Sequence, residues 1–285
     1  KLFFDLCPAP IIGVTGTKGK GTTSSLLYEF AKSNPEFNNV YLAGNIGEPA
    51  ITLLDRLVKN DLVILELSSF QLQDLHKSPH IAVITNLGVD HLNYHKDRDE
   101  YIKAKQSIFK YQNADDYLIV NSEIEADYYR NAKSQILKFS KDDQNDGAAV
   151  IAKDECAEYF VSIKLEDRLV KVASESEIIL VGKHNLENIA AATIAAGILG
   201  CDIDSVKAIV KKFPGLPHRL EFVSEIDNVK YYNDSFATNP EPTIAAIRSF
   251  NQNKILILGG SSKGADFKKL AHEITISNVI SVILI

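Results

Sequence analysis

A glycine- and lysine-rich loop is the clearest chemical signal in the sequence. The segment GVTGTKGKGTT covers residues 13–23 and lies between an apolar, β-branched run at 11–16 and a helical pattern. Glycines let the backbone curl so that several N–H groups point at one anion, and a helix N-terminus adds partial positive charge. The segment therefore predicts a phosphate-binding loop that opens a helix.

The same loop offers a cation and hydroxyl groups to a bound nucleotide. Lys20 is placed to reach the β- and γ-phosphates, but Gly21 follows it, so the spacing departs from the common G-x-x-x-x-G-K-[ST] form. We therefore expect Thr22, with Thr23 behind it, to supply the hydroxyl that binds Mg²⁺. The alternative, a glycine-rich turn that binds nothing, is disfavoured by the strand–loop–helix context.

Polar groups also follow two other apolar runs. Glu66 comes after LVIL, and His91 comes just after the run at 80–87. In doubly wound sheets ligands bind at the carboxyl ends of strands, so Glu66 is expected to bind Mg²⁺ or to hold the attacking group. The alternatives are a helix N-terminal charge for Glu66 and a structural hydrogen bond for His91. Lys105 lies on a predicted helix, where a solvent-exposed face is the default interpretation.

Short apolar runs alternate with helical patterns through the first half of the chain. The runs at 11–16, 61–68, 80–87 and 115–121 are apolar on both faces, which is typical of buried parallel strands covered by helices. Beyond residue 145, segments rich in valine, isoleucine and alternating polar residues predict a small antiparallel sub-sheet. The predicted fold class is therefore α/β, a P-loop-type domain with a mostly parallel sheet.

A second α/β unit follows the segment PGLP at 214–217, which is the best candidate for a linker. A hairpin pattern turns at Asp227-Asn228, and helices then alternate with strands in a Rossmann-like order. The length of 285 residues fits about two domains at roughly 100–200 residues each. We place one domain at 1–213 and a truncated second domain at 214–285.

Composition excludes several classes of protein. A net charge of −6 disfavours a general nucleic-acid or anionic-membrane binder. No apolar run approaches the length of about 18 residues that a membrane span needs. The three cysteines are far apart and odd in number, which excludes a disulfide framework and suits a reducing compartment. We expect a cytoplasmic protein that binds neither nucleic acid nor membranes.

Nine segments, in order along nearly the whole chain, resemble the Mur ligase family. They are GTKGKGTT, GNIGEPA, ELSSFQLQ, TNLGVDHLNYH, YIKAKQSIF, GKHNLENIAAA, PGLPHRLEFV, NDSFATNPEPT and GGSSKGADF. ELSSFQL and GLPHR are the most specific of them and resemble the members that add D-glutamate. The phosphate loop alone does not choose among members of the family.

The resemblance implies an ATP-dependent amide ligase built from three domains. Its central domain would bind ATP, and its C-terminal, Rossmann-like domain would bind the incoming amino acid. This chain would begin at the central domain, lack the N-terminal UDP-sugar domain, and stop within the C-terminal one. The implied substrates are ATP, UDP-N-acetylmuramoyl-L-alanine and D-glutamate. The implied cofactor is Mg²⁺, and we expect a monomer.

The resemblance also assigns roles to residues. The phosphate loop would bind ATP through Gly16, Thr17, Lys18, Gly19, Lys20, Gly21 and Thr22. Asn185, Arg219 and Asp234 would complete the ATP site, with Asn185 facing adenine. Thr22, Glu66, His91 and Lys105 would hold the metal, and Asn45, Ser68, Thr238 and Lys263 would contact the substrates. Catalysis would involve Lys20, His91, Lys105 and Lys263. Lys105 aligns with a lysine that is carbamylated in this family, a change that creates an oxygen ligand suited to Mg²⁺.

Two positions depart from the pattern of the D-glutamate-adding members. Gly21 stands where many of them have serine or threonine, and Phe236 stands where many have lysine. The second departure removes one cation from the amino-acid site and leaves Lys263 there. Three alternatives stay open: a folylpolyglutamate synthase, another amino-acid-adding Mur ligase, and a nucleotide-binding module without ligase activity. ELSSFQL and DSFATN are not motifs of the folate enzymes.

Overall fold

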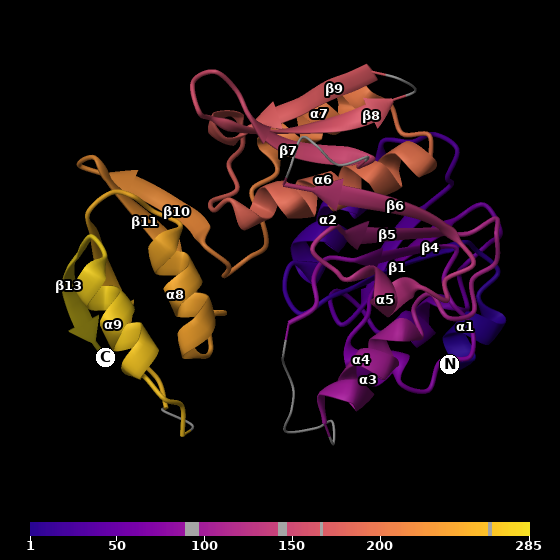
Figure 1. The fold of residues 1–285 in the computed structure, drawn as a ribbon, viewed down its shortest axis with the longest axis horizontal. Helices are drawn as coiled ribbons and strands as arrows, with labels where there is room; N and C mark the ends of the chain where they lie inside the picture. The colour runs from indigo at the N-terminus through magenta and orange to yellow at the C-terminus, as the bar shows by residue number, and fades with distance from the viewer. Residues whose placement is uncertain (89–96, 142–146, 166–167, 262–263) are drawn as a thin grey trace. The chain divides into compact units, whose positions relative to one another are not determined.

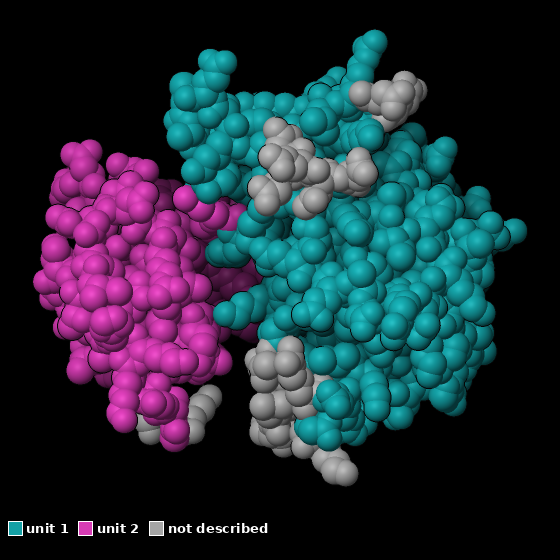
Figure 2. Space-filling model, in the orientation of Figure 1, with its two compact units in different colours: residues 1–178, 184–213 teal, residues 179–183, 214–285 magenta. Residues whose placement is uncertain are grey.

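The computed structural model describes residues 1–88, 97–141, 147–165, 168–261 and 264–285 (Figure 1). The chain divides into two compact units, coloured separately in Figure 2. Unit 1 comprises Lys1–Ile178 and His184–Phe213, and unit 2 comprises Ile179–Lys183 and Pro214–Ile285. Within the described residues, no helix combines the length and apolar character that crossing a membrane requires.

Unit 1 is an α/β structure built on one large sheet (Figure 1). Its strands are β1 (Ile11–Thr15), β2 (Val40–Gly44), β3 (Leu62–Glu66), β4 (Ile81–Ile84), β5 (Tyr117–Asn121), β6 (Gln135–Ser140), β7 (Ala149–Lys153), β8 (Tyr159–Leu165) and β9 (Arg168–Ser174). Its helices are α1 (Leu2–Leu6), α2 (Lys20–Lys32), α3 (Ser69–Leu72), α4 (Arg98–Gln106), α5 (Ala126–Tyr129), α6 (His184–Ile198) and α7 (Ile203–Lys212), with 3₁₀ turns η1 (Ala50–Leu53) and η2 (Glu175–Glu177).

The strands lie in the order β2-β3-β1-β4-β5-β6-β7-β8-β9. Neighbours from β2 through β7 pair in parallel, whereas β7–β8 and β8–β9 are antiparallel. The predicted α/β class with a mostly parallel sheet is therefore confirmed. The antiparallel strands were expected as a small sub-sheet, and they extend the main sheet because β7 pairs with β6.

The central strands are apolar on both faces because both faces are covered. Every residue of β1, β3 and β4 is buried. Alternate residues of a strand point to opposite faces, and Val63, Leu65, Ala82 and Ile84 share one core cluster with Phe3 of α1. On the sheet, α2 contacts β1, β2 and β3, and it also packs against α6, which contacts β4 to β8. The burial of the central strands therefore follows from the helices packed on the sheet.

The part of unit 2 that follows Pro214 contains a hairpin and continues as an α/β pattern. The hairpin joins β10 (Glu221–Ile226) and β11 (Val229–Asn233) through Asp227 and Asn228, whose φ values are 50° and 61°. Two positive φ values are typical of the tight turns that match strand twist, and they confirm the predicted turn. The elements that follow are α8 (Pro240–Arg248), β12 (Lys254–Leu258), α9 (Lys268–Ile276) and β13 (Val279–Leu284), with β12 parallel to β13.

Candidate functional site

Residues 16–19 form the phosphate loop between β1 and α2. Gly16 and Gly19 have φ values of 152° and 81°, and Gly19 is the N-cap of α2. A Cβ atom at Gly16 would lie 1.9 Å from Thr85 Oγ1, and one at Gly19 would lie 2.2 Å from Asn188 Oδ1. Both positions therefore require glycine, for backbone conformation and for close approach.

The carboxyl end of β4 holds the loop in place. Asn86 Oδ1 accepts the Thr17 and Lys18 N–H groups at 3.1 and 2.9 Å, and Asn86 Nδ2 donates to Lys18 O at 3.0 Å. Thr85 Oγ1 donates to the same carbonyl at 2.5 Å. Sequence reasoning assigned no role to Thr85 or Asn86, and the only available signal was their position at the end of a strand beside β1. Their contacts hold the loop in its observed conformation.

Two lysine side chains converge on one carbonyl of the loop. Lys20 Nζ donates to Gly16 O at 2.9 Å and to Thr17 O at 3.2 Å. Lys105 Nζ, from α4, donates to Gly16 O at 2.9 Å and to Thr15 Oγ1 at 3.3 Å. The Lys105 residue is only 2% exposed. The interpretation of Lys105 as a solvent-exposed helix lysine is therefore wrong, because α4 packs its side chain against the end of β1.

A carboxylate lies at the same edge of the sheet. Glu66 ends β3, is 6% exposed, and is in register with Val14 of β1 and Gly44 of β2. Its Oε1 accepts Asn45 Nδ2 at 2.9 Å, and its carbonyl accepts the Asn45 N–H at 2.9 Å. The structure therefore brings together Glu66 and Asn45, which the family resemblance assigned to a metal and to substrate.

The other predicted residues of unit 1 lie at helix starts. Ser68 is the N-cap of α3 and forms a capping box with Gln71, so its hydroxyl accepts a backbone N–H. Asn185, in the first turn of α6, is 7% exposed, and its Oδ1 accepts Asn188 Nδ2 at 2.9 Å. Asn188 Oδ1 in turn accepts Thr23 Oγ1 at 3.3 Å. A chain of buried polar contacts thus joins Asn185 to the first turn of α2.

Unit 2 carries the remaining described residues of the predicted site. Arg219 and Asp234 lie close enough for their charges to interact, and Asp234 Oδ1 accepts the Leu220 N–H at 3.1 Å. Burial raises the pKa of the Asp234 carboxyl, and the Leu220 N–H and the Arg219 charge oppose that rise. Thr238 follows on the same segment, and its N–H donates to Phe236 O at 3.0 Å. The predictions for His91 and Lys263 fall outside the described residues.

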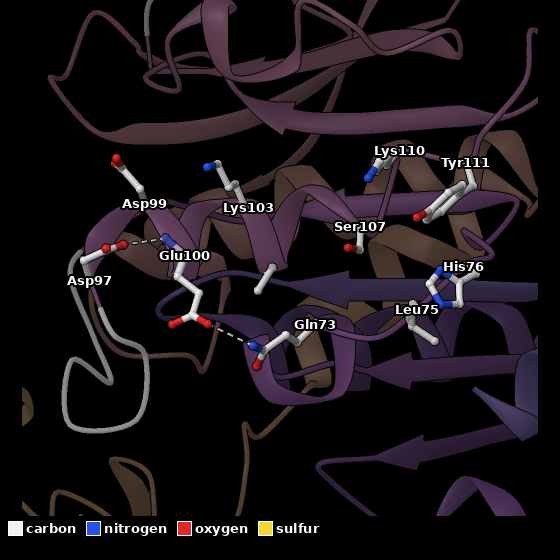
Figure 3. A pocket seen from close by; sticks show the side chains of 11 residues that line it. Gln73, Leu75, His76, Asp97, Asp99, Glu100, Lys103, Ser107, Lys110 and Tyr111 are labelled. Atoms are coloured by element: carbon white, nitrogen blue, oxygen red, sulfur yellow. Dashed lines mark hydrogen bonds between the residues drawn. The ribbon is translucent and has the colours of Figure 1, made fainter.

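A separate groove runs along α4, shown in Figure 3. It is lined by acidic and basic side chains, among them Asp99, Lys103 and Lys110, and includes a Gln73–Glu100 hydrogen bond of 3.1 Å. None of the predicted site residues lines it. Among the described residues, no group of three or more His, Cys, Asp or Glu side chains is arranged to hold a metal ion.

Comparison with known proteins agrees with the sequence resemblance. A model of the Mur ligase middle domain matches residues 14–196, and a model of the Mur ligase glutamate ligase domain matches 218–285. A UDP-N-acetylmuramoylalanine–D-glutamate ligase of Clostridium tetani is 41% identical over 99% of this chain and 59% of its own length. The protein of the same name from Acetivibrio thermocellus is 39% identical over 95% of this chain and 57% of its own length. The chain thus spans somewhat more than half the length of these relatives.

Solved structures share the fold at lower sequence identity. MurF from Acinetobacter baumannii superposes with a TM-score of 0.74 at 20% identity, covering 99% of this chain and 64% of that one. A mutant of L. casei FPGS superposes with a TM-score of 0.65 at 15% identity, covering 99% of this chain and 89% of that one. At these identities the likeness establishes the fold alone. Taken with the two domain models and the D-glutamate ligase relatives, it shows that this chain belongs to the Mur ligase family.

Proposed function

We propose that the complete gene product containing this chain is an ATP-dependent ligase that joins D-glutamate to UDP-N-acetylmuramoyl-L-alanine. The observation that carries the proposal is the 41% and 39% identity, over 99% and 95% of this chain, to proteins named for that reaction. Residues 1–213 act as the ATP-binding domain and 214–285 belong to the C-terminal domain. The enzyme works as a monomer in the cytoplasm.

ATP binds at the phosphate loop. Asn86 already occupies the Thr17 and Lys18 N–H groups, so the phosphates meet the N–H groups of the first turn of α2, which have no intrahelical acceptors. Lys20 leaves the Gly16 and Thr17 carbonyls, to which it donates in this structure, and pairs with the β- and γ-phosphates. Gly16, Gly19 and Gly21 keep the backbone close to the nucleotide, with Asn185 on the adenine side.

Glu66 at the carboxyl end of β3 and Thr22 in the first turn of α2 would hold a magnesium ion. The Glu66 carboxylate and the Thr22 hydroxyl are hard oxygen donors, the ligand type that Mg²⁺ prefers. His91 joins them by resemblance alone. When bound, Mg²⁺ neutralises negative charge on the phosphates. The Asn45–Glu66 hydrogen bond keeps the carboxylate oriented toward this edge of the sheet.

We further propose that Lys105 is carbamylated, as the family resemblance implies, and the convergence of two lysines on one carbonyl supports this. Two ammonium groups that donate to one oxygen, Gly16 O, are close enough to repel each other. In the reaction, the neutral Lys105 amine forms an N–C bond to CO₂ and releases a proton, which leaves an anionic carbamate. The change replaces repulsion of Lys20 by attraction and supplies an oxygen ligand. A carbamate ¹³C signal in bicarbonate-treated protein, missing in Lys105→Arg, is the expected result, and its absence from the wild type would refute the modification.

The chain's own groups then stabilise the transfer. The substrate carboxylate attacks the γ-phosphorus, ADP leaves, and the amine of D-glutamate displaces phosphate from the resulting acyl phosphate. Lys20 and Lys263 stabilise developing negative charge, and loss of one such contact typically costs on the order of 10²–10³ in rate. Asn45, Ser68 and Thr238 contact the substrates, and Arg219 and Asp234 bind ATP from the C-terminal domain.

Phosphate release tests the assignment. The complete gene product is supplied with ATP, UDP-N-acetylmuramoyl-L-alanine and D-glutamate, and separately with ATP, a folate and L-glutamate. We expect turnover with the first set, and turnover only with the folate set would overturn the proposal. Lys20→Ala should abolish ATP binding, whereas Lys105→Ala should retain binding and lose ligation. Binding of ATP without ligation by the wild type would instead indicate a nucleotide-binding module.

A further inference from the structure

Unit 2 holds Arg219 in an unusual backbone setting. The residues on either side of it, His218 and Leu220, have φ values of 63° and 44° although neither is glycine. Non-glycine residues in the left-handed region are uncommon, and such conformations concentrate at ligand-binding sites. The loop around Arg219 therefore keeps a conformation that its own residues disfavour.

Contacts with the segment after β11 fix this conformation. His218 O accepts the Phe236 N–H at 3.1 Å, and Leu220 N–H donates to Asp234 Oδ1 at 3.1 Å. Asn233 Nδ2 lies 2.8 Å from His218 Nδ1. Both flanks of Arg219 are thus tied to residues 233–236, so the base of its side chain has a defined position relative to Phe236.

The Arg219 side chain lies over an exposed aromatic ring. Its guanidinium carbon is 4.6 Å from the centroid of the Phe236 ring, within the range of a cation–π contact. Phe236 is 57% exposed, so core packing does not account for it. Among the residues that the structure describes, Arg219 donates no side-chain hydrogen bond. A guanidinium held over a ring keeps its planar N–H edge available for an oxyanion.

From this geometry we infer that Phe236 is a positioning residue that holds the Arg219 guanidinium ready for the phosphates of ATP. The inference rests on the proposed function, which assigns Arg219 to ATP. A preorganised arginine loses less rotamer freedom when it binds, so the ring improves ground-state affinity for ATP. An exposed cation–π contact corresponds to about a two- to five-fold change in affinity.

Steady-state kinetics of the complete gene product test this role. Phe236→Leu keeps an apolar side chain but removes the aromatic face, so the KM for ATP should rise about two- to five-fold with kcat and the KM for D-glutamate unchanged. Phe236→Tyr should restore the KM. Phe222→Leu, which removes another exposed ring of unit 2 that contacts Tyr232, is the matched control and should leave the KM unchanged.

A double-mutant cycle separates the contact from a general effect on folding. In an Arg219→Gln background, Phe236→Leu should have no further effect on the KM for ATP, because the cation is gone. An unchanged KM in Phe236→Leu, or an equal rise in both backgrounds, would overturn the inference.

An NMR measurement makes failure of this inference distinguishable from failure of the proposed function. In the wild type, the Arg219 Nε–H proton should show a ring-current shift that Phe236→Leu removes and Phe236→Tyr keeps. Loss of the shift together with an unchanged KM would show that the contact exists but does not serve ATP. A wild type that shows the shift yet turns over no ATP would refute the proposed function, and absence of the shift would refute the positioning role itself.

Discussion

Replacement of Gly19 by alanine tests the packing of the phosphate loop against α6. The φ of 81° at Gly19 lies in the left-handed region, which costs alanine about 1–2 kcal/mol. The new Cβ would also lie 2.2 Å from Asn188 Oδ1, so the Asn188 side chain must move. That movement breaks its hydrogen bonds with Thr23 Oγ1 and Asn185 Oδ1, and unsatisfied buried groups cost about 1–3 kcal/mol.

Together, the backbone cost and the lost hydrogen bonds predict that Gly19→Ala lowers the free energy of unfolding of unit 1 by about 2–5 kcal/mol. Urea unfolding followed by far-UV circular dichroism measures the loss, and hydrogen exchange of α2 and α6 assigns it to unit 1. Gly200→Ala is the matched control, because Gly200 has a similar φ of 72° and a Cβ there would meet nothing within 4 Å. It should show the backbone cost of about 1–2 kcal/mol alone.

A second substitution isolates the collision. In an Asn188→Ala background the obstructing oxygen is gone, so Gly19→Ala should cost only the backbone term of about 1–2 kcal/mol. Equal losses for Gly19→Ala and Gly200→Ala, or an undiminished loss in the double variant, would refute the reasoning from close approach.

Three further predictions concern other parts of the chain. Burial raises the pKa of Cys201 to about 11, so at pH 8 iodoacetamide should label the exposed Cys156 first. Mass spectrometry should show Cys201 labelling rise about tenfold per pH unit, as its thiolate fraction does, and equal rates at pH 8 would contradict this. Burial also raises the folded-state pKa of Asp234. The folded state therefore binds the proton of Asp234 more tightly, which stabilises unit 2 at pH values below the ordinary carboxyl pKa. This contribution is lost as the pH rises through the folded-state pKa. Asp234→Asn should flatten the fall in the free energy of unfolding between pH 3 and 7, as measured by urea unfolding. An unchanged pH profile would exclude Asp234 as the source of that fall. Asp61 is fully buried and accepts one backbone N–H and one side-chain amide. Asp61→Ala should therefore lower the free energy of unfolding by about 2–3 kcal/mol in thermal or urea unfolding, and Asp61→Asn should lower it less. Equal losses for the two variants would argue against a role of these hydrogen bonds.

The sequence predicted the elements whose local pattern is strong. β1, β3 and β4 are continuous apolar runs, and burial on both faces is the physical reason. It missed β2 and β6, two short strands whose residues are mostly half-buried or exposed rather than buried on both faces. Beyond residue 145 the predicted antiparallel pattern ends early, because β9 stops at Ser174, which caps a 3₁₀ turn by a capping box with Glu177.

The site shows the same division between local and distant information. Glycines and Lys20 stand together in the chain, so their loop was predictable from spacing. Lys105 has no local signal, because its surroundings come from Gly16, 89 residues away. Asn86 is 68 residues from Lys18, whose N–H and carbonyl it binds. Contacts of this kind depend on the order of strands in the sheet, which a single sequence does not specify.

The shared carbonyl of Gly16 has a thermodynamic consequence. Lys20 and Lys105 both donate to it, so an event that removes one ammonium changes the environment of the other. Under the proposed chemistry, nucleotide binding draws Lys20 away, and CO₂ uptake converts Lys105. Linkage then requires each ligand to change the affinity of the other by the same factor. Titration of ATP at several bicarbonate concentrations measures this coupling, and Lys105→Arg should remove it. The phosphate loop would then report on dissolved CO₂ as well as on ATP.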